Sequence, residues 1–431
     1  MIAHRMHFSS QLSYTPFNTT KSMKIFFLGI SGTFMGNLAQ IARELDHEVL
    51  GCDNKVYPPM SDELKSLGIN FSEGYEESNF EEADLYIIGN AISKENKLLQ
   101  KILDSNKNIT SGPKWLHDNV LSKKTVIAVS GTHGKTTVTS MISHALLENG
   151  INANYLIAGI PKTLKKSWNI SSSELFVIEA DEYDTCYFDK KPKFFHYNPS
   201  ILLINNIEFD HADIYENIEM IEKNFLDLIE SMPKESKILV NSNKVRESFK
   251  NSLSKLNVNA KIEFFELESL DISEENKQLA CKALEGRLAT EQVLASLDHY
   301  GGVKRRFETI YESPDFKVID DFAHHPTAIE ETLAMAKKEN SNLELIIELG
   351  SNSMRKGIHD DRLIEILSGN AAYTINASLE QQKKFTGIAK ELDLQDLETI
   401  CSKDNEKKTI LMCGNRNFQG FQQLIIDKLI K

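Results

Sequence analysis

The sequence predicts an α/β protein of three domains, in which strands alternate with helices. Two apolar runs, KIFFL at 24–28 and VIAV at 126–129, are each followed by a glycine-rich loop and then by apolar residues at helical spacing. From residue 302 onward a further series of short strands and helices follows. Such alternation is typical of parallel sheets covered by helices.

Composition limits the kind of protein. The chain of 431 residues is long enough for two to four domains with substantial cores. No run of 18 apolar residues could cross a membrane, and the net charge of −13 argues against nucleic acid as a partner. Five scattered cysteines without metal-ligand spacing indicate reduced thiols in a cytosol. The polar residues 1–22 predict a disordered extension that is no secretory signal.

The first predicted domain, 23–120, begins with a βαβ pattern. A strand at 24–28 leads into Gly29-Ile30-Ser31-Gly32-Thr33, a helix from about Asn37 to Leu45, and a strand that ends beside Asp53. An acid at that place often binds a ribose. Because the glycine spacing is not G-x-G-x-x-G, a nicotinamide cofactor is disfavoured, and the loop can hold any diphosphate.

The same domain contains a second strand end with polar residues. The strand at 84–89 is followed by Asn90-Ala91-Ile92-Ser93, and the segment SGPKWL at 111–116 opens a helix that closes the domain. These features predict a Rossmann-like unit.

The central domain, 121–301, opens with TVIAVSGTHGKTTVTSMISHALLENG at 125–150. Its strand, loop and helix predict a phosphate-binding P-loop, which consists of Gly131, Thr132, His133, Gly134, Lys135, Thr136 and Thr137. Loop N–H groups and the helix N-terminus would bind phosphate oxygens. Lys135 would reach the β/γ-phosphates, and the Thr136 hydroxyl would bind Mg²⁺. The alternative is a strand-to-helix turn that merely contains Gly, Lys and Thr.

Two further strand ends carry acidic residues. The apolar run at 175–178 precedes Glu179-Ala180-Asp181-Glu182-Tyr183-Asp184, and the run at 201–204 precedes NNIEFDHAD at 205–213. Crowded carboxylates favour a cation, and His211 between Asp210 and Asp213 is a candidate metal ligand. Open α/β sheets bind ligands at the carboxyl edge, where all these segments are expected. A solvated acidic loop and a structural histidine are the alternatives.

The third domain, 302–431, begins with the basic segment GVKRRFE at 302–308. A hairpin through 318–319 leads to DDFAHHPTAI at 320–329, where Pro326 suits the first turn of a helix. A strand at 343–347 ends at ELGSNSMR, and strands at 373–376 and 409–412 complete a second Rossmann-like unit.

The form G-T-x-G-K-T-T, with two residues between the glycines in place of four, resembles the Mur ligases, ATP-dependent enzymes that join amino acids or peptides to muramic acid precursors. The segments GISGTFMG, VYPPMS, IIGNAIS, SGPKWLH and DDFAHHP resemble in particular the branch that attaches the tripeptide L-Ala-γ-D-Glu-meso-diaminopimelate to UDP-N-acetylmuramate in peptidoglycan recycling. This resemblance implies Rossmann-like end domains around a P-loop domain. It also implies ATP, Mg²⁺, the UDP-sugar and the tripeptide as ligands, an acyl-phosphate intermediate, and a cytoplasmic monomer or weak oligomer.

The resemblance also implies roles for individual residues. The catalytic residues would be Lys135, Glu179 and His211, and the last two would hold a second Mg²⁺ beside the one on Thr136. Besides the P-loop, ATP would contact Asn276, Arg306 and Asp321. The UDP-sugar would contact Gly29, Ser31, Gly32, Thr33, Asp53, Asn90 and Ser93. The peptide would contact Ser351, Asn352, Arg355 and Lys356.

Two departures from the family pattern are visible. The segment 241–278 lacks a Gly-x-His-Asn motif, so the central domain is expected to be shortened, with Asn276 as the remaining adenine contact. Where relatives read E-P-R-S-N-T-M, this chain has Leu349 and Gly350 in place of proline and arginine, which leaves Arg355 or Lys356 to bind a substrate carboxylate.

Three alternatives stay open at this point. One is a UDP-N-acetylmuramate–L-alanine ligase, which would accept a single amino acid. Another is a small-molecule kinase with the same P-loop, which would need no amine acceptor. The third is a non-catalytic sugar-nucleotide sensor, which the missing adenine and arginine residues favour.

Overall fold

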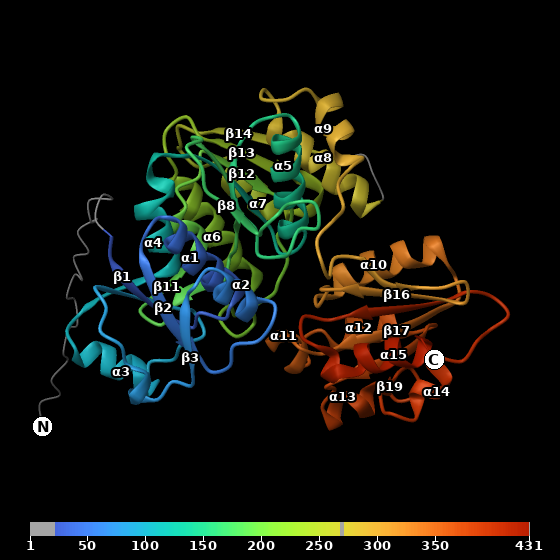
Figure 1. Ribbon diagram of the computed structural model, residues 1–431. Coiled ribbons are helices and arrows are strands. Elements are labelled where there is room, and N and C mark those ends of the chain that lie inside the picture. The colour runs from blue at the N-terminus through green and yellow to red at the C-terminus, as the bar shows by residue number, and fades with distance from the viewer. Residues whose placement is uncertain (1–21, 268–270, 431) are drawn as a thin grey trace, which may run out of the picture. The chain divides into compact units, whose positions relative to one another are not determined.

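The computed structural model describes residues 22–267 and 271–430 (Figure 1). The predicted extension at 1–22 therefore lies outside the described residues, apart from Ser22. The chain divides into two compact units, and the boundary is not a single cut. The first unit comprises the chain up to Lys124 together with Asp184–Lys191, and the second comprises Thr125–Tyr183 and everything from Pro192 onward.

The first unit contains a five-stranded, all-parallel sheet in the order β3-β2-β1-β4-β5. Its strands are β1 (Lys24–Leu28), β2 (Glu48–Asp53), β3 (Asn70–Glu73), β4 (Leu85–Ile88) and β5 (Asn108–Ser111). Its helices are α1 (Thr33–Glu44), α2 (Met60–Ser66), α3 (Lys97–Asp104) and α4 (Gly112–Asn119). The strands β10 (Asp184–Cys186) and β11 (Asp189–Pro192) pair as a separate hairpin.

Alternating residues of the first sheet pack on its two faces. Phe26, Tyr86 and Ile88 join the core beneath α3, together with Tyr187 of the hairpin. On the other face, Phe27 contacts Trp115 of α4 edge to face. Helix α4 begins where the sequence predicts, because the Ser111 hydroxyl accepts the Lys114 N–H and Pro113 occupies the first turn.

The predicted start of the first helix is wrong. The structure begins α1 at Thr33, whereas the sequence placed the start near Asn37. Gly32 is extended and forms the N-cap, so the glycine loop after β1 is only four residues long, from Gly29 to Gly32. The short loop brings the helix N-terminus directly to the carboxyl end of β1.

The central sheet of the second unit has seven strands in the order β14-β13-β12-β6-β9-β7-β8. All its pairs are parallel except β7–β8. The strands are β6 (Thr125–Ser130), β7 (Asn154–Leu156), β8 (Trp168–Asn169), β9 (Leu175–Ala180), β12 (Ile201–Ile204), β13 (Lys237–Asn241) and β14 (Lys261–Phe265). The helices are α5 (Lys135–Glu148), α6 (Ile218–Ser231), α7 (Glu247–Leu253), α8 (Ile272–Leu284) and α9 (Thr290–Leu297).

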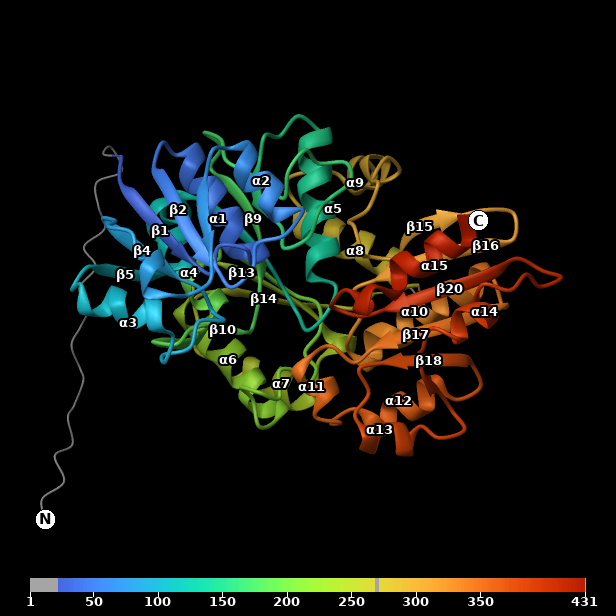
Figure 2. The same cartoon turned by 60° about the horizontal axis from the view of Figure 1, so that its bottom comes forward.

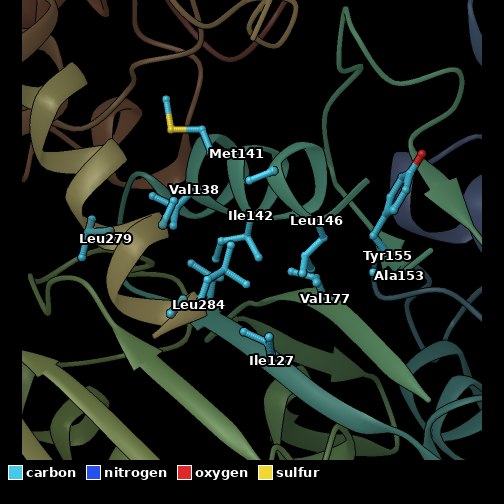
Figure 3. Packing of buried hydrophobic residues seen from close by; sticks show 14 of the residues in the cluster. Ile127, Val138, Met141, Ile142, Leu146, Ala153, Tyr155, Val177, Leu279 and Leu284 are labelled. Atoms are coloured by element: carbon cyan, nitrogen blue, oxygen red, sulfur yellow. The ribbon is translucent and has the colours of Figure 1, made fainter. Parts of the chain in front are cut away.

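The central helix α5 is buried along most of its length. Figure 3 shows Val138, Ile142 and Leu146 packed between the sheet residues Ile127 and Val177 and the residues of α8. Helix α9 contributes to the same core, whereas α6 and α7 lie on the opposite side of the sheet (Figure 2). Because β6 is covered on both faces, it reads as a continuous apolar run instead of an alternating one.

The C-terminal sheet of the second unit has six strands in the order β15-β16-β20-β17-β18-β19. Strand β15 is antiparallel to β16, which confirms the predicted hairpin, and the remaining pairs are parallel. The strands are β15 (Glu308–Glu312), β16 (Phe316–Asp321), β17 (Leu343–Glu348), β18 (Ala371–Ile375), β19 (Lys390–Glu391) and β20 (Lys408–Cys413). The helices are α10 (Pro326–Glu339), α11 (Asn352–Arg355), α12 (Asp360–Leu367), α13 (Leu379–Lys384), α14 (Asp396–Ile400) and α15 (Phe421–Ile430).

Helices cover both faces of this sheet. Ile319, Leu345 and Leu411 face the core beneath α10, α12 and α13. Their neighbours Val318, Ile346, Ile410 and Met412 face a second core beneath α14 and α15. The predicted role of Pro326 as the first residue of α10 is confirmed. In the part of the chain that the structure describes, every helix is too short or too polar to span a bilayer.

Candidate active site

Three strand ends meet at one edge of the central sheet, as the sequence predicts. In the register, Ser130 at the end of β6 lies beside Ala180 of β9 on one side and Ile204 of β12 on the other. The P-loop, the acidic segment 179–184 and the segment 205–213 therefore follow adjacent strands. Their polar side chains converge at the carboxyl edge.

Two glycines shape the P-loop. Gly131 has φ +142°, and a Cβ there would lie 3.1 Å from the backbone N and O of Asn206. Gly134 has φ +83° and caps α5, and a Cβ there would lie 2.8 Å from Nδ2 of Asn205. Any other residue would be strained at both places and would push the loop away from β12. The loop thus leaves the first N–H groups of α5 pointing to its open side.

Lys135 lies across the loop and is surrounded by acids. Its Nζ donates to the Gly131 carbonyl at 2.6 Å and to Glu182 Oε2 at 2.9 Å, and lies 3.6 Å from Asp181 Oδ1. Burial lowers the pKa of Lys135, but Glu182 and Asp181 raise it more, so the amine stays charged. The side chain that would bind phosphate is held in place by carboxylates.

Thr136 of the P-loop contacts Glu179 at the end of β9. The Thr136 hydroxyl donates to Glu179 Oε2 at 3.0 Å, and the other Glu179 oxygen accepts the Ala158 N–H at 2.6 Å. Arg306 donates to Thr136 Oγ1 at 3.1 Å and stacks over Phe322. Burial raises the pKa of Glu179, because the nearby positive charges and hydrogen bonds do not fully offset the cost of burying its negative charge. A hydroxyl and a buried carboxylate suit a hard cation such as Mg²⁺.

His211 lies with two other residues of the acidic segment. One ligand atom each of Asp181, Glu182 and His211 lies within 4.8 Å of the others, and His211 Nε2 is 3.6 Å from Glu182 Oε1. The backbone of His211 is left-handed, with φ +55°, which is uncommon outside glycine and is often found at functional sites. The structure thus groups His211 with Asp181 and Glu182 and places Glu179 beside Thr136. A shared metal on Glu179 and His211 stays a prediction.

Glu208 connects the P-loop to the C-terminal sheet's first helix. Its Oε1 is 3.0 Å from His133 Nε2, and its Oε2 accepts the Thr327 hydroxyl at 2.5 Å and lies 3.5 Å from His325 Nδ1. Burial raises the pKa of Glu208, but His133 and Thr327 lower it more, to about 2. Sequence reasoning missed Glu208 and Thr327, although the motifs NNIEFD and HHPT that contain them follow strands.

The predicted nucleotide contacts Asn276 and Asp321 differ in whether their side-chain oxygens already accept hydrogen bonds. Asn276 on α8 is only 7% exposed, and among the described residues its Oδ1 has no hydrogen-bond partner. That oxygen would lie 3.6 Å from a Cβ on Gly134, so it faces the P-loop. Asp321, in contrast, accepts the N–H groups of Phe307 and Ala323 at 2.6 and 2.7 Å. Its carboxylate therefore braces the surrounding turns in this structure.

The predicted sugar-binding residues lie at the carboxyl edge of the first unit's sheet. Gly29, Ser31, Gly32 and Thr33 follow β1, and Asp53 ends the neighbouring β2. Both Ser31 N–H and its hydroxyl donate to Asp53 Oδ2, at 2.9 and 2.6 Å, and Tyr75 donates to Oδ1 at 2.6 Å. Asn90 follows β4 on the other side of β1 and donates to the carbonyl and Oδ1 of Asp184. Ser93 is exposed.

A cavity of about 260 Å³ lies beside the acidic segment, within the second unit. Its lining residues come from the acidic strand ends and from the loops after β16, β17 and β20: Tyr183, Asp210, His211, Asp213, His324, Gly350, Ser351, Asn352, Ser353, Asn415 and Arg416. Two predicted peptide contacts, Ser351 and Asn352, are among them.

The other two predicted peptide contacts, Arg355 and Lys356, do not line this cavity. Arg355 donates to Asn352 Oδ1 at 2.6 Å, and Lys356 donates to the Ala212 carbonyl at 3.2 Å. Their role in peptide binding stays a prediction.

Family models match three successive parts of the chain. Residues 24–124 match the model described as Mur ligase family, catalytic domain, residues 129–293 match the Mur ligase middle domain, and residues 305–414 match the Mur ligase, glutamate ligase domain. A ligase from Haemophilus influenzae is 34% identical, and the alignment covers 94% of this chain and 99% of that relative. The chain belongs to the Mur ligase family. That relative is a UDP-N-acetylmuramate–L-alanyl-γ-D-glutamyl-meso-2,6-diaminoheptandioate ligase.

Other members of the Mur ligase family show the same pattern. The ligase of the same name from Escherichia coli is also 34% identical, with 95% of this chain and 99% of that relative covered. The UDP-N-acetylmuramate–L-alanine ligase of Clostridium acetobutylicum is 30% identical, with 87% of each covered. The crystal structure of a murein peptide ligase from Psychrobacter arcticus is 32% identical and superposes with a TM-score of 0.73 over 95% of this chain and 99% of that one. The predicted α/β architecture of the Mur ligases is thereby confirmed.

Proposed function

We propose that this chain is an ATP-dependent ligase that joins L-Ala-γ-D-Glu-meso-diaminopimelate to UDP-N-acetylmuramate, in the cytoplasm and in peptidoglycan recycling. The observation that carries the proposal is the nearly full-length similarity, at 34% identity, to two ligases named for this reaction. The assembled P-loop, with Lys135 and Thr136 beside buried acids, supports the ATP-dependent part.

The chemistry requires activation of a carboxylate, because oxide is a poor leaving group. The muramoyl carboxylate attacks the γ-phosphorus of ATP, which yields an acyl phosphate and ADP. The amine of the peptide then attacks the acyl carbon, the C–O bond breaks, and phosphate leaves while the amine gives up a proton. Catalysis of this kind rests mainly on positioning and on neutralising charge.

The residues of the P-loop would supply that neutralisation. Lys135 would exchange its contact with Glu182 for the β/γ-phosphates, and Arg306, which already reaches Thr136, would lie beside the same phosphates. Because Glu179 is buried with its pKa raised, Thr136 and Glu179 fit one Mg²⁺, and His211 with Asp181 and Glu182 fits a second. Bound there, Mg²⁺ would offset the negative charge of the phosphates and the acyl carboxylate.

Asn276 would recognise the base of the nucleotide. Its buried Oδ1, which has no hydrogen-bond partner within residues 22–267 and 271–430, faces the P-loop and can accept a hydrogen bond from the exocyclic amine of adenine. This contact would compensate for the missing Gly-x-His-Asn motif. Asp321 accepts one backbone N–H on each carboxylate oxygen, so each oxygen keeps a lone pair that could accept a hydroxyl of the ribose.

The deciding experiment supplies UDP-N-acetylmuramate, ATP and Mg²⁺ with either the tripeptide or free L-alanine, and detects the product by mass. The proposal expects the UDP-muramoyl tripeptide, and ADP release that needs both the sugar and the peptide. Equal or better use of L-alanine would place the chain with the alanine-adding ligases. ADP release without a peptide would indicate a kinase, and tight binding of the UDP-sugar without turnover would indicate a sensor.

A further inference from the structure

The cavity beside the acidic segment has two walls of opposite charge. One wall, from the central part of the second unit, carries Asp210 and Asp213. Asp210 Oδ1 accepts the Ser353 hydroxyl at 2.9 Å, and Asp213 accepts the Tyr183 hydroxyl, so both carboxylates are held at this wall. The opposite wall, from the C-terminal sheet, carries Arg416. A ligand with an amine at one end and a carboxylate at the other matches this arrangement.

The position of Arg416 depends on a glycine across the wall. A Cβ on Gly350 would lie 3.0 Å from Cγ and 3.2 Å from Cδ of Arg416, and only 2.3 Å from Oδ1 of Asn415. The stem of Arg416 therefore occupies the space that any side chain at position 350 would need.

A buried carboxylate fixes the loop that carries Arg416. Glu348, at the end of β17, is 1% exposed, and its Oε2 accepts the N–H of Arg416 at 3.1 Å. The Phe418 N–H also donates to Glu348, and the Phe418 ring is buried in the core beneath α15. The backbone of Arg416 is thus anchored on both sides, which places its side chain at the cavity.

The guanidinium of Arg416 is available to a ligand. The residue is exposed, and in the described ranges 22–267 and 271–430 its side chain forms no hydrogen bond and no ion pair. By comparison, Arg355 is engaged with Asn352. An unpaired arginine at the wall of a cavity is suited to bidentate binding of a carboxylate.

We infer that Arg416 binds a carboxylate of the incoming amine substrate and so sets its orientation, a role that rests on the proposed ligase function. The reacting amine then lies toward Asp210, and the distal carboxylate of the peptide lies toward Arg416. Arg416 acts on binding and positioning, because it contacts no reacting atom.

The first test compares Arg416→Ala with Arg362→Ala, which removes an exposed arginine of α12 that pairs with Glu330 outside the cavity. A charge-assisted contact of this kind is worth about 1.5–3 kcal/mol, so R416A should raise the KM for the tripeptide roughly 10- to 100-fold. The KM values for ATP and UDP-N-acetylmuramate should not change, and R362A should match the wild type. A tripeptide KM for R416A within about twofold of the wild type would overturn the inference.

A second test separates binding from a merely structural role. Amidation of the tripeptide's distal carboxylates should raise the KM of the wild type and leave that of R416A nearly unchanged. Gly350→Arg should impair peptide binding, because it collides with the Arg416 stem, and the double variant G350R/R416G should restore it by moving the arginine across the wall. If neither the amide comparison nor the rescue gives the expected result, Arg416 has no role in peptide binding and the inference is wrong.

The outcomes also separate this inference from the proposed function. If the wild type prefers free L-alanine, the proposed acceptor is wrong, whereas Arg416 is still tested through the KM for L-alanine, which also carries a carboxylate. If the wild type uses the tripeptide and R416A is unaffected, the function holds and the inference fails. If no acceptor promotes ADP release by the wild type, both fail.

Discussion

Replacement of Lys135 by methionine should separate stability from catalysis at the P-loop. The change removes the ammonium that lies 2.9 Å from Glu182 and 3.6 Å from Asp181. Removal of one partner of a buried ion pair costs about 3–5 kcal/mol. Asp181 keeps Lys193 at 2.7 Å, whereas Glu182 is 2% exposed and loses its main cation, so the lower end of about 3 kcal/mol applies. For a unit of this size that corresponds to a fall in Tm of roughly 5 °C.

The pH dependence follows from Glu182. Burial raises its pKa, but Lys135 lowers it more, so the folded pKa lies below the ordinary value of 4.5. A depressed folded pKa gives stability that is present above the unfolded pKa and is lost as the pH falls through the folded pKa. The stability difference between wild type and K135M should therefore be full at pH 8 and should shrink as the pH falls below 4.5.

The assay pairs thermal unfolding at pH 8 and pH 4 with ADP release and with calorimetric binding of UDP-N-acetylmuramate. We expect ADP release to fall by roughly 10²-fold or more, with sugar binding retained. The double variant K135M/E182Q should regain most of the stability and none of the turnover, because it removes both charges. An unchanged Tm for K135M at pH 8 would refute the buried ion pair, and near-normal ADP release would refute the P-loop assignment.

Three further predictions concern the same site. His211→Ala should lower turnover and raise the Mg²⁺ concentration needed for half-maximal activity; a magnesium titration that overlays the wild type would make His211 structural. Asn276→Ala should raise the KM for ATP about tenfold with little change in kcat, since one hydrogen bond to the base is lost, and an unchanged KM would remove Asn276 from the base pocket. Glu208→Gln should lower the free energy of unfolding at pH 7 and have little effect near pH 2, because the Glu208 pKa of about 2 lies below the ordinary value of 4.5 and the stabilisation by its carboxylate is lost over that window. Equal destabilisation at both pH values, measured by denaturant unfolding, would contradict a stabilising role of the ionised Glu208 carboxylate.

Much of the fold could be predicted because local patterns were unambiguous. The run at 201–204 is a strand with the predicted bounds, and Pro326 begins α10 as predicted. Because the carboxyl ends of parallel strands lie at one edge of a sheet, the segments at the ends of β6, β9 and β12 could be predicted to lie together without any knowledge of long-range contacts. These predictions depend only on periodicity, strand polarity and turn chemistry.

The details of the site could not be predicted, because they depend on side-chain direction. Four carboxylates lie at or after the end of β9, and the sequence cannot show that Glu179 turns toward Thr136 while Glu182 turns toward Lys135 and His211. Arg416 was missed for a related reason. It lies 66 residues beyond Gly350 in the chain, and only the pairing of β17 with β20 places the two loops side by side.

The hairpin of β10 and β11 has a mechanical consequence. Since its residues Asp184–Lys191 belong to the first unit, the chain passes between the units after Lys124, after Tyr183 and after Lys191. The units are therefore tied by three covalent links, and after a nick at Lys124 the fragment up to Lys124 would be held to the rest of the chain only by its contacts with the hairpin. A fragment that ends at Lys124 would lose the partner of the Asn90 amide as well as Tyr187 from its core. The link after Tyr183 lies within the acidic segment 179–184, so Asp184 belongs to the first unit while Asp181 and Glu182 belong to the second.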